Sequence, residues 1–217
     1  MSLRRQAGAL VGAREQFTVV VRDHVTPWLV GRGYTVSKKR LFTKKGGLLR
    51  TIRVDPGKYV DRRSYDFALM LNLGVPGLTW VTLTQWDWGL NLAVHGQFPW
   101  KQARRFELVE GADPGPVAEA ALSALDEAFQ EFWDEPVTPE DLIGILIGDQ
   151  DRLDHLQVFP PNAFGRAVLA AGIARHLGRS AQVEELKARV ADCATIGHVE
   201  HLLPGALARI DAVEAFA

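Results

Sequence analysis

Five cationic side chains near the start of the chain have the types and the spacing that best suit a binding site. They are Lys38, Lys39, Arg40, Lys44 and Lys45. Ammonium and guanidinium groups gathered on one surface attract carboxylates and phosphates. The cluster therefore predicts a binding surface for an acidic protein partner or, as an alternative, for the phosphates of a nucleic acid.

The charges are segregated along the whole chain. Residues 32–63 contain 11 lysines and arginines against 2 acids, whereas residues 107–160 contain 14 acids against 1 arginine. One interpretation is structural: the basic and acidic parts face each other across the fold or lie on separate solvated surfaces. The other is functional: the basic part binds a partner. The pI of about 6.6 makes nucleic acid the less favoured partner, because the acidic part would repel phosphates.

A metal or cofactor site is not expected. His198 and His201 are three positions apart and Glu200 precedes the second, whereas zincins space two histidines by four and place glutamate after the first. The sequence contains no glycine-rich phosphate loop, no Gly-x-Ser-x-Gly elbow and no Cys-x-x-Cys pair. We therefore predict no metal ligation and no cofactor.

An enzyme with a dispersed active site is the chief alternative to a binding protein. Residues 78–100 are rich in aromatic side chains, and a cleft beside them could combine His95, Asp87 and Tyr65. Aromatic residues bury large areas wherever they pack, so a core role is favoured for them. A concave site with converging polar groups would support the enzyme, and an exposed patch would support the binder.

The first element is a helix over residues 9–30, because its apolar residues recur at spacings of three and four. Pro27 should kink this helix or begin a new turn with Thr26 as its cap, since proline has no N–H to donate. Gly31 and Gly33 end it.

An antiparallel β-meander follows. In the segment Tyr65–Val75, alternate residues from Tyr65 to Leu73 are apolar and predict a side that faces the core. Gly46 and Gly47 predict a hairpin turn through positive φ, and Asp55-Pro56-Gly57 should stop the third strand. A further strand piece is expected near residues 80–84 and another at 105–109. The four main segments are Tyr34–Val36, Leu41–Lys44, Leu48–Val54 and Tyr65–Val75.

The remainder reads as helical. One helix over residues 117–133 should cover the sheet, and Thr138 followed by Pro139 begins a wholly helical part. Further helices are expected over residues 161–177, 180–194 and 203–216. The predicted fold is therefore α+β: an antiparallel meander packed with helices over residues 1–135, then an all-helical C-terminal extension over residues 136–217.

Three short segments resemble domain-of-unknown-function family 4304: Trp28–Tyr34 (WLVGRGY), Ser37–Phe42 (SKKRLF) and Phe67–Val75 (FALMLNLGV). The likeness covers roughly residues 14–133. This chain has Arg53-Val54-Asp55-Pro56 where the family carries Gln-Lys-Ser, so no polar feature is transferred. The resemblance implies a fold without an assigned chemistry, and some relatives look like immunity-associated or defence-associated accessory proteins.

A cytoplasmic, non-membrane protein is expected. The only cysteine, Cys193, has no intrachain partner, which favours a reducing compartment. The apolar run at residues 142–147 is too short to span a bilayer, and glycines and Arg14 interrupt the N-terminal stretch that a signal peptide would need. The leading interpretation is a non-enzymatic bacterial accessory protein that binds another protein. The partner and the oligomeric state stay open.

Overall fold

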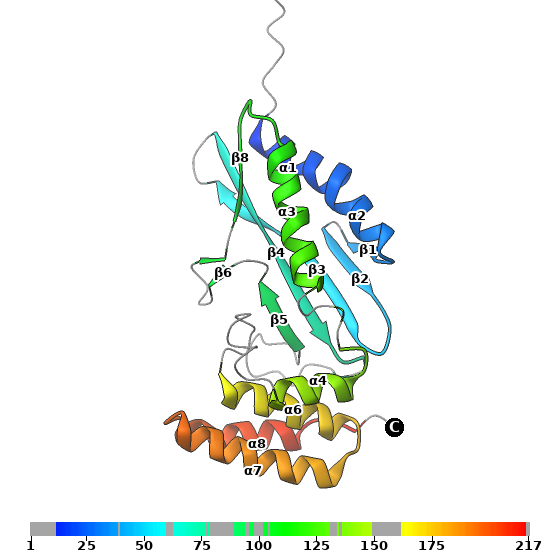
Figure 1. The fold of residues 1–217 in the computed structure, drawn as a ribbon. Helices are drawn as coiled ribbons and strands as arrows, with labels where there is room; N and C mark the ends of the chain where they lie inside the picture. Colours follow the sequence, from blue (N-terminus) through cyan, green and yellow to red (C-terminus); the bar gives the residue numbers. More distant parts are fainter. Residues whose placement is uncertain are drawn as a thin grey trace, which may run out of the picture.

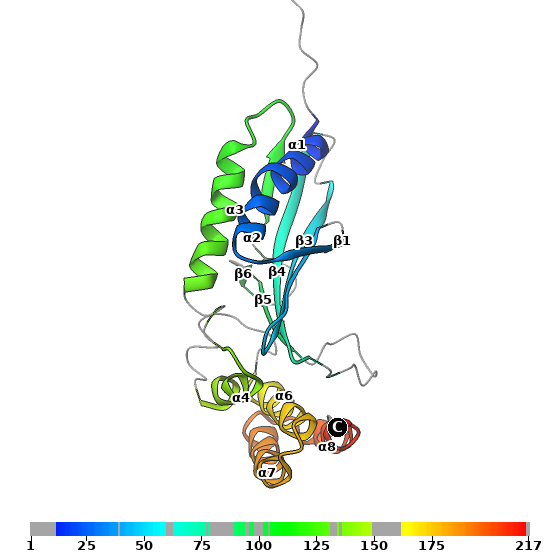
Figure 2. The ribbon, with the colours of Figure 1, turned by 90° about the vertical axis from the view of Figure 1, so that its right-hand side faces the viewer.

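The fold is an antiparallel sheet with helices on one face and a helical group at one end (Figures 1 and 2). The computed structural model describes residues 12–38, 40–59, 63–76, 78, 89–93, 96–97, 102–103, 105–130, 134, 136–148 and 162–215. The predicted α+β class with C-terminal helices is confirmed.

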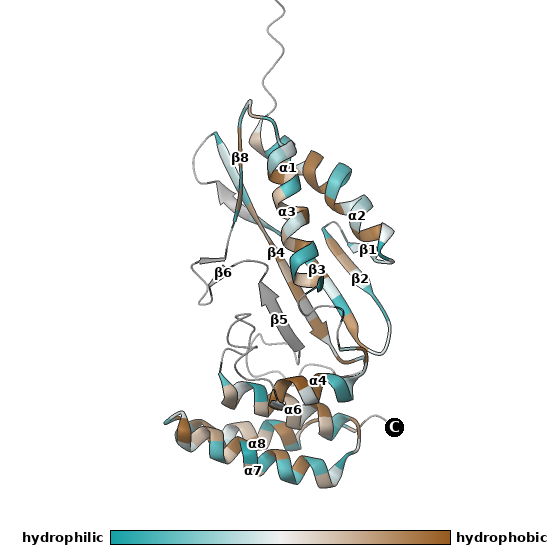
Figure 3. Cartoon of the chain, viewed as in Figure 1, coloured by the Kyte–Doolittle hydropathy of each residue, from teal (hydrophilic) through white to brown (hydrophobic). Residues whose placement is uncertain are grey.

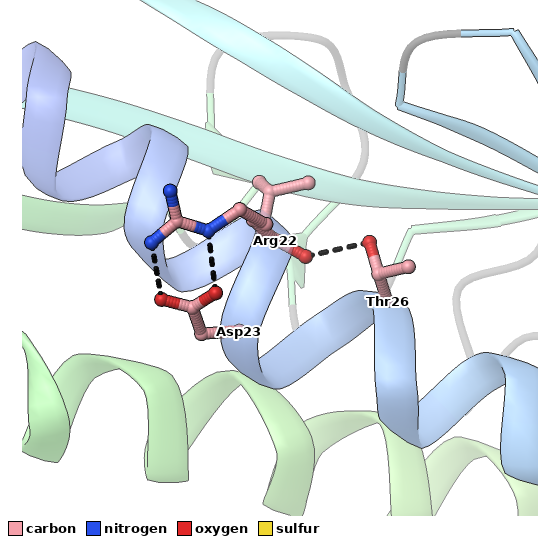
Figure 4. A network of polar contacts seen from close by, with 4 residues as sticks. Arg22, Asp23 and Thr26 are labelled. Atoms are coloured by element: carbon pink, nitrogen blue, oxygen red, sulfur yellow. Dashed lines mark hydrogen bonds and ion pairs between the residues drawn. The ribbon is translucent and has the colours of Figure 1, made fainter.

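The first helix runs as α1 (Ala13–Val19), a π-helical turn η1 (Val20–Val25) and α2 (Thr26–Gly31). Of the two alternatives at Pro27, a capping role for Thr26 is not observed, because its backbone is helical and its hydroxyl donates to the Val21 carbonyl at 2.7 Å (Figure 4). Its N–H also donates to the Val21 carbonyl, five residues back. Pro27 has no N–H to donate to the Asp23 carbonyl, so one helical hydrogen bond is missing at this point. The wider π-helical turn η1 immediately precedes it.

The side chain of Asp23 lies on the outer surface of the same turn. The Arg22 guanidinium donates two hydrogen bonds to the Asp23 carboxylate, one from Nε at 2.5 Å and one from a terminal nitrogen at 2.6 Å (Figure 4). These bonds lower the pKa of Asp23. The helix ends as predicted, since Gly33 adopts φ +84° and the N–H of Tyr34 returns to the Leu29 carbonyl.

The main sheet has the order β1-β2-β3-β4-β5, with β8 also paired to β4, and every pairing is antiparallel. The predicted antiparallel meander is confirmed, and β6 and β7 pair with each other in a separate two-stranded sheet. The strand expected near residues 80–84 lies outside the described residues. The strands are β1 (Thr35–Lys38), β2 (Leu41–Lys44), β3 (Leu49–Tyr59), β4 (Ser64–Gly74), β5 (Gly89–Ala93), β6 (Gly96–Gln97), β7 (Gln102–Ala103) and β8 (Phe106–Val109).

Strand β3 continues through Pro56, so the prediction that Asp55-Pro56-Gly57 stops it is wrong. The N–H of Val54 points toward β2 and donates to the Arg40 carbonyl at 2.9 Å. The nitrogen of Pro56, two residues further on, is on the same side. Strand β2 begins at Leu41, which pairs with Arg53, so no β2 residue lies opposite Pro56. The N–H that proline lacks therefore removes no hydrogen bond from the sheet.

The core lies between the sheet and helices α1 to α3. All five alternate residues from Tyr65 to Leu73 are buried, which confirms the predicted core face. The ring of Phe17 on α1 lies 5.1 Å from Tyr65 and 5.4 Å from Phe67, centroid to centroid. Hydrophobic residues run along β2, β3 and β4 (Figure 3). Burial of these side chains is the main force that joins the helices to the sheet.

The remaining helices begin with α3 (Gly115–Ala128), which packs on η1 and β8. The start of α4 is a capping box: the Asp141 N–H donates to the Thr138 hydroxyl, and the Asp141 carboxylate accepts from the Thr138 N–H at 2.8 Å. That backbone bond lowers the pKa of Asp141. The C-terminal elements are α4 (Pro139–Gly148), α6 (Ala163–His176), α7 (Ser180–Ile196), η3 (Glu200–Leu202) and α8 (Leu203–Asp211).

The β2–β3 hairpin lies against the start of α4. A Cβ on Gly47 would overlap the Val137 carbonyl oxygen, whereas a Cβ on Gly46 would meet its nearest atom at 3.8 Å. Among the described glycines, positive φ occurs at Gly33, Gly111 and Gly178. The hairpin is confirmed, but Gly47 is needed for close backbone approach and not for positive φ.

Replacing Gly47 with alanine should therefore destabilise the protein by about 1–3 kcal/mol, the usual cost of overpacking. Gly46→Ala is the matched control, because it adds the same methyl group in the same turn at an ordinary contact distance. Urea denaturation of both variants measures the difference. Equal stability of the two variants would contradict the close approach.

Candidate interaction site on the open face of the sheet

Strand alternation gives the sheet two chemically distinct faces. One row across the strands, Val36, Phe42, Ile52 and Leu71, is apolar and lies on the side of the helices. The neighbouring row lies on the opposite side and is polar. Its members, paired in register across three strands, are Thr35, Thr43 and Thr51.

The polar side of the sheet is its open face. Helix α1 contacts β4 and β8, α3 contacts β8, and α2 contacts β1. Figure 2 shows these helices on one side of the sheet. In the part of the chain that the structure describes, no helix covers the other side; over β1 to β3 the side chains of Thr35, Lys38 and Arg53 are exposed there, whereas Ser64 and Ala68 of β4 are buried.

The threonine row carries hydroxyl groups in register. The Thr35 hydroxyl donates to the Thr43 carbonyl at 3.1 Å, and the two hydroxyl oxygens lie 3.3 Å apart. Thr35 is exposed, while Thr43 and Thr51 are half-buried between neighbouring strands. Neighbouring strands are about 4.8 Å apart, so the row presents donors and acceptors at that interval.

Two cations belong to the open face beside this row. The register pairs Lys38 with Leu41 and Leu41 with Arg53, so Lys38 and Arg53 are two strands apart in one row. Their separation is about 10 Å at the usual strand spacing. Lys38 is exposed, and the Arg53 side chain is 59% exposed with Asp55 Oδ1 3.7 Å away. An exposed pair of this length contributes little, so Arg53 can exchange it for a ligand carboxylate.

The predicted cluster of five cations is divided by the fold. Arg40 and Lys44 lie on the helix side, where the Arg40 guanidinium is 5.6 Å from the Phe17 ring and Lys44 Nζ is 5.7 Å from the Tyr34 ring. Lys45 is exposed in the β2–β3 turn, and Lys39 lies outside the described residues. Only Lys38 of the four described cations shares the open face with Arg53.

Part of the charge segregation is used inside the molecule. Arg32 pairs with Asp126 of α3 at 2.7 Å, and buried Arg50 lies 3.9 Å from Asp134 and donates to the Pro136 carbonyl. These contacts agree with the expectation that basic and acidic parts face each other. Lys38 and Arg53 do not take part in these cross-segment pairs.

The far end of the open face carries both signs of charge. Asp66 pairs in register with Glu107, and Arg105 Nε lies 2.6 Å from the largely buried Asp66 carboxylate, which it neutralises. Glu107 is exposed. The cationic part of the open face is therefore limited to β1 to β3.

The structure describes only one of the three residues of the enzyme alternative, so the described residues do not test that alternative. Tyr65 is buried in the core against Phe17, and Asp87 and His95 lie outside the described residues. His198 and His201 are exposed, and the described residues contain no group of three metal-ligating side chains. Cys193 is a half-buried free thiol.

Aromatic side chains described on the strands belong to the helix-covered side. Phe42, Tyr65, Phe67 and Phe106 are all buried there. Sheets that bind single-stranded nucleic acid stack bases on exposed aromatic rings. The described part of the open face does not have this stacking chemistry and instead offers hydroxyl groups and two cations.

Comparison with known proteins gives no match. No family model, curated protein or solved structure is significantly similar to this chain. The resemblance to family 4304 therefore stays a prediction. Among the described residues, no helix combines the length and the apolar character needed to cross a membrane.

Sequence reasoning missed Arg53 and the threonine row. Arg53 contributed to the charge count of residues 32–63, but only the register places it beside Lys38. The threonines come from three strands and are separated by about eight positions in the sequence. Alternation carries only a partial signal for them, since Thr43 and Thr51 each have one apolar neighbour, Phe42 and Ile52, and one cationic neighbour, Lys44 and Arg50.

Proposed function

We propose that this protein is a non-enzymatic accessory protein that binds an acidic protein partner through the open face of its sheet. The observation that carries the proposal is the face without a described helix, on which Lys38 and Arg53 lie on either side of Leu41 in the row next to the threonine hydroxyl groups. Such a face provides complementary charge and hydrogen bonds without a large apolar patch, as in many reversible complexes.

The two alternatives have less support. A catalytic site requires polar groups that converge on a substrate. Tyr65 instead packs in the core beside Phe17, which also contacts Phe67. Nucleic acid would contact several phosphates, whereas Arg40 and Lys44 lie over aromatic rings and Arg32 is paired with Asp126. An acidic protein needs fewer cations and can use the threonine hydroxyls.

Reversal of the two charges tests the proposal. The double variant Lys38→Glu, Arg53→Glu should lose capture of an acidic protein that the unchanged protein retains from nuclease-treated lysate. The control Arg14→Glu, Lys45→Glu changes the net charge equally at exposed positions off the open face. Captured proteins are identified by mass spectrometry, and circular dichroism checks that both variants fold.

Three outcomes decide the matter. Selective loss in the first variant, with binding that weakens as salt rises, supports the acidic partner. Equal loss in both variants indicates attraction by net charge and contradicts a specific face. Loss of capture on nuclease treatment of the unchanged protein would show nucleic acid to be the ligand.

A further inference from the structure

Two cations of the basic part are left over on the open face. Within the molecule, Arg32 and Arg50 meet carboxylates of the acidic part. Lys38 is exposed and has no carboxylate partner among the described residues. Arg53 has only the 3.7 Å contact with Asp55 of its own strand. These two cations are therefore available to carboxylates of another molecule.

Unpaired carboxylates occur on the connection from β8 to α3. We call residues 106–119 the acidic corner, because they contain four acidic side chains and no lysine or arginine. All four side chains are exposed, and no cation of the described residues forms an ion pair with any of them. Both views show the corner at the upper end of the molecule, where it projects beyond the sheet (Figures 1 and 2). The four are Glu107, Glu110, Asp113 and Glu119.

Hydrogen bonds hold the acidic corner in one shape. The N–H of Glu110 donates to the Arg63 carbonyl at 2.7 Å, and the N–H of Ala112 donates to the Val109 carbonyl at 3.0 Å. The side-chain amide of Gln16 on α1 donates to the Ala112 carbonyl at 2.8 Å. A segment that is already ordered loses little conformational entropy when it binds. The corner can therefore present its carboxylates to another molecule without rearrangement.

The fold holds the acidic corner and the two cations apart within one molecule. Strand β8 pairs with β4, and β2 and β3 lie between β4 and β1. Arg53 lies opposite Met70 of β4, whereas Glu107 lies opposite Asp66, near the start of that strand. The whole chain has a net charge of −1, so two copies repel each other little while their oppositely charged parts attract. Each copy thus carries both the cations and the carboxylates that suit them.

We propose that the acidic partner is a second copy of this chain, whose acidic corner binds the open face over β1 to β3. Glu107 and Glu110 of one copy pair with Lys38 and Arg53 of the other. Arg53 exchanges its weak contact with Asp55 for a carboxylate of the second copy. This inference rests on the function proposed above and names the partner.

Analytical ultracentrifugation of the full chain tests self-association. At low salt, the weight-average mass should rise with protein concentration above the 24.0 kDa of one chain. Added salt should reverse the rise, because exposed charges are screened. The mass of one chain at every concentration would overturn the inference.

Charge-reversal variants assign the two surfaces. Lys38→Glu, Arg53→Glu and, separately, Glu107→Lys, Glu110→Lys should each raise the dissociation constant about tenfold or more, as expected when two exposed ion pairs become repulsions. The control is Glu185→Lys, Glu200→Lys, which changes exposed acids of the C-terminal helices and should associate like the unchanged protein. An unchanged dissociation constant in either test variant contradicts the contact.

Exchange of both charges in one chain provides the decisive test. The variant with all four changes turns two cations into acids and two acids into lysines, so its net charge stays −1. A negative open face then meets a positive corner, and self-association should return. Failure to return, in a chain that circular dichroism shows to be folded, overturns the inference. If the reversal at the corner prevents folding, Glu107→Gln, Glu110→Gln removes the charges without changing the shape and should also weaken association.

The failure of this inference is distinguishable from failure of the proposed function. If Lys38→Glu, Arg53→Glu loses capture of an acidic protein from lysate while the unchanged chain keeps the mass of one chain, the open face is the binding site and the second copy is the wrong partner. If the charge reversal leaves capture intact, also of an untagged copy added to the lysate, the proposed function itself fails.

Discussion

Replacing Phe67 with alanine should lower the free energy of unfolding by about 3–5 kcal/mol, the usual cost of truncating a buried aromatic residue. Phe67 is fully buried on β4, and its ring lies 5.4 Å from Phe17 and 5.2 Å from Phe106. It therefore joins α1, β4 and β8 in one cluster. Removal of the ring leaves a cavity that three elements would have to close together.

Val109→Ala on β8 is the control for Phe67→Ala. Val109 is 46% exposed and belongs to the open face, so its truncation should cost below about 1 kcal/mol. Urea denaturation followed by circular dichroism gives both values. A loss below about 1 kcal/mol for Phe67→Ala would show that the contact of the helices with the sheet does not depend on this cluster.

Replacing His176 with alanine should cost about 2–4 kcal/mol. His176 is buried at the end of α6, with Nδ1 3.2 Å from the Glu214 carbonyl and Nε2 3.2 Å from the Pro76 carbonyl. Loss of the ring leaves both carbonyls without this contact, and a buried polar group without a partner costs about 1–3 kcal/mol. The variant should also free the C-terminal residues from the end of β4.

Hydrogen exchange locates that effect. In His176→Ala, amides of α8 and of residues 212–215 should exchange faster, whereas amides of β2 and β3 should keep their protection. His201→Ala, which truncates an exposed histidine, is the control and should leave both regions unchanged. Equal loss of amide protection in all elements would contradict the inference that His176 holds only the C-terminal residues in place.

The local elements followed from residue patterns, because alternation and turn residues act over a few positions. Tyr65 to Leu73 predicted a core-facing strand, and the buried side chains confirm it. The hairpin at Gly46 and Gly47 was also predicted, although the reason for Gly47 lies in Val137, which is remote in the sequence. Pro56 was read as a stop because the sequence does not show how far β2 extends alongside β3.

The candidate site was less accessible to sequence reasoning. Lys38 and Lys44 are close in the sequence, so they were grouped, but alternation and the β1–β2 turn place them on opposite faces. Arg53 joins Lys38 only through two strand registers. A binding face of a sheet is defined across strands, and proximity along the chain is a poor guide to it.

The register shift in β1 has a consequence for behaviour at high concentration. Sheet proteins can polymerise when an exposed edge strand recruits the edge of another molecule. Here the outermost strand has four residues, its regular hydrogen-bonding side ends after Val36, and Lys38 follows. Short length, a bulge and lysine are the features that protect edge strands from growth into fibrils. Lys38, which we propose as a partner contact on the open face, thus helps to keep the β1 edge from templating aggregation.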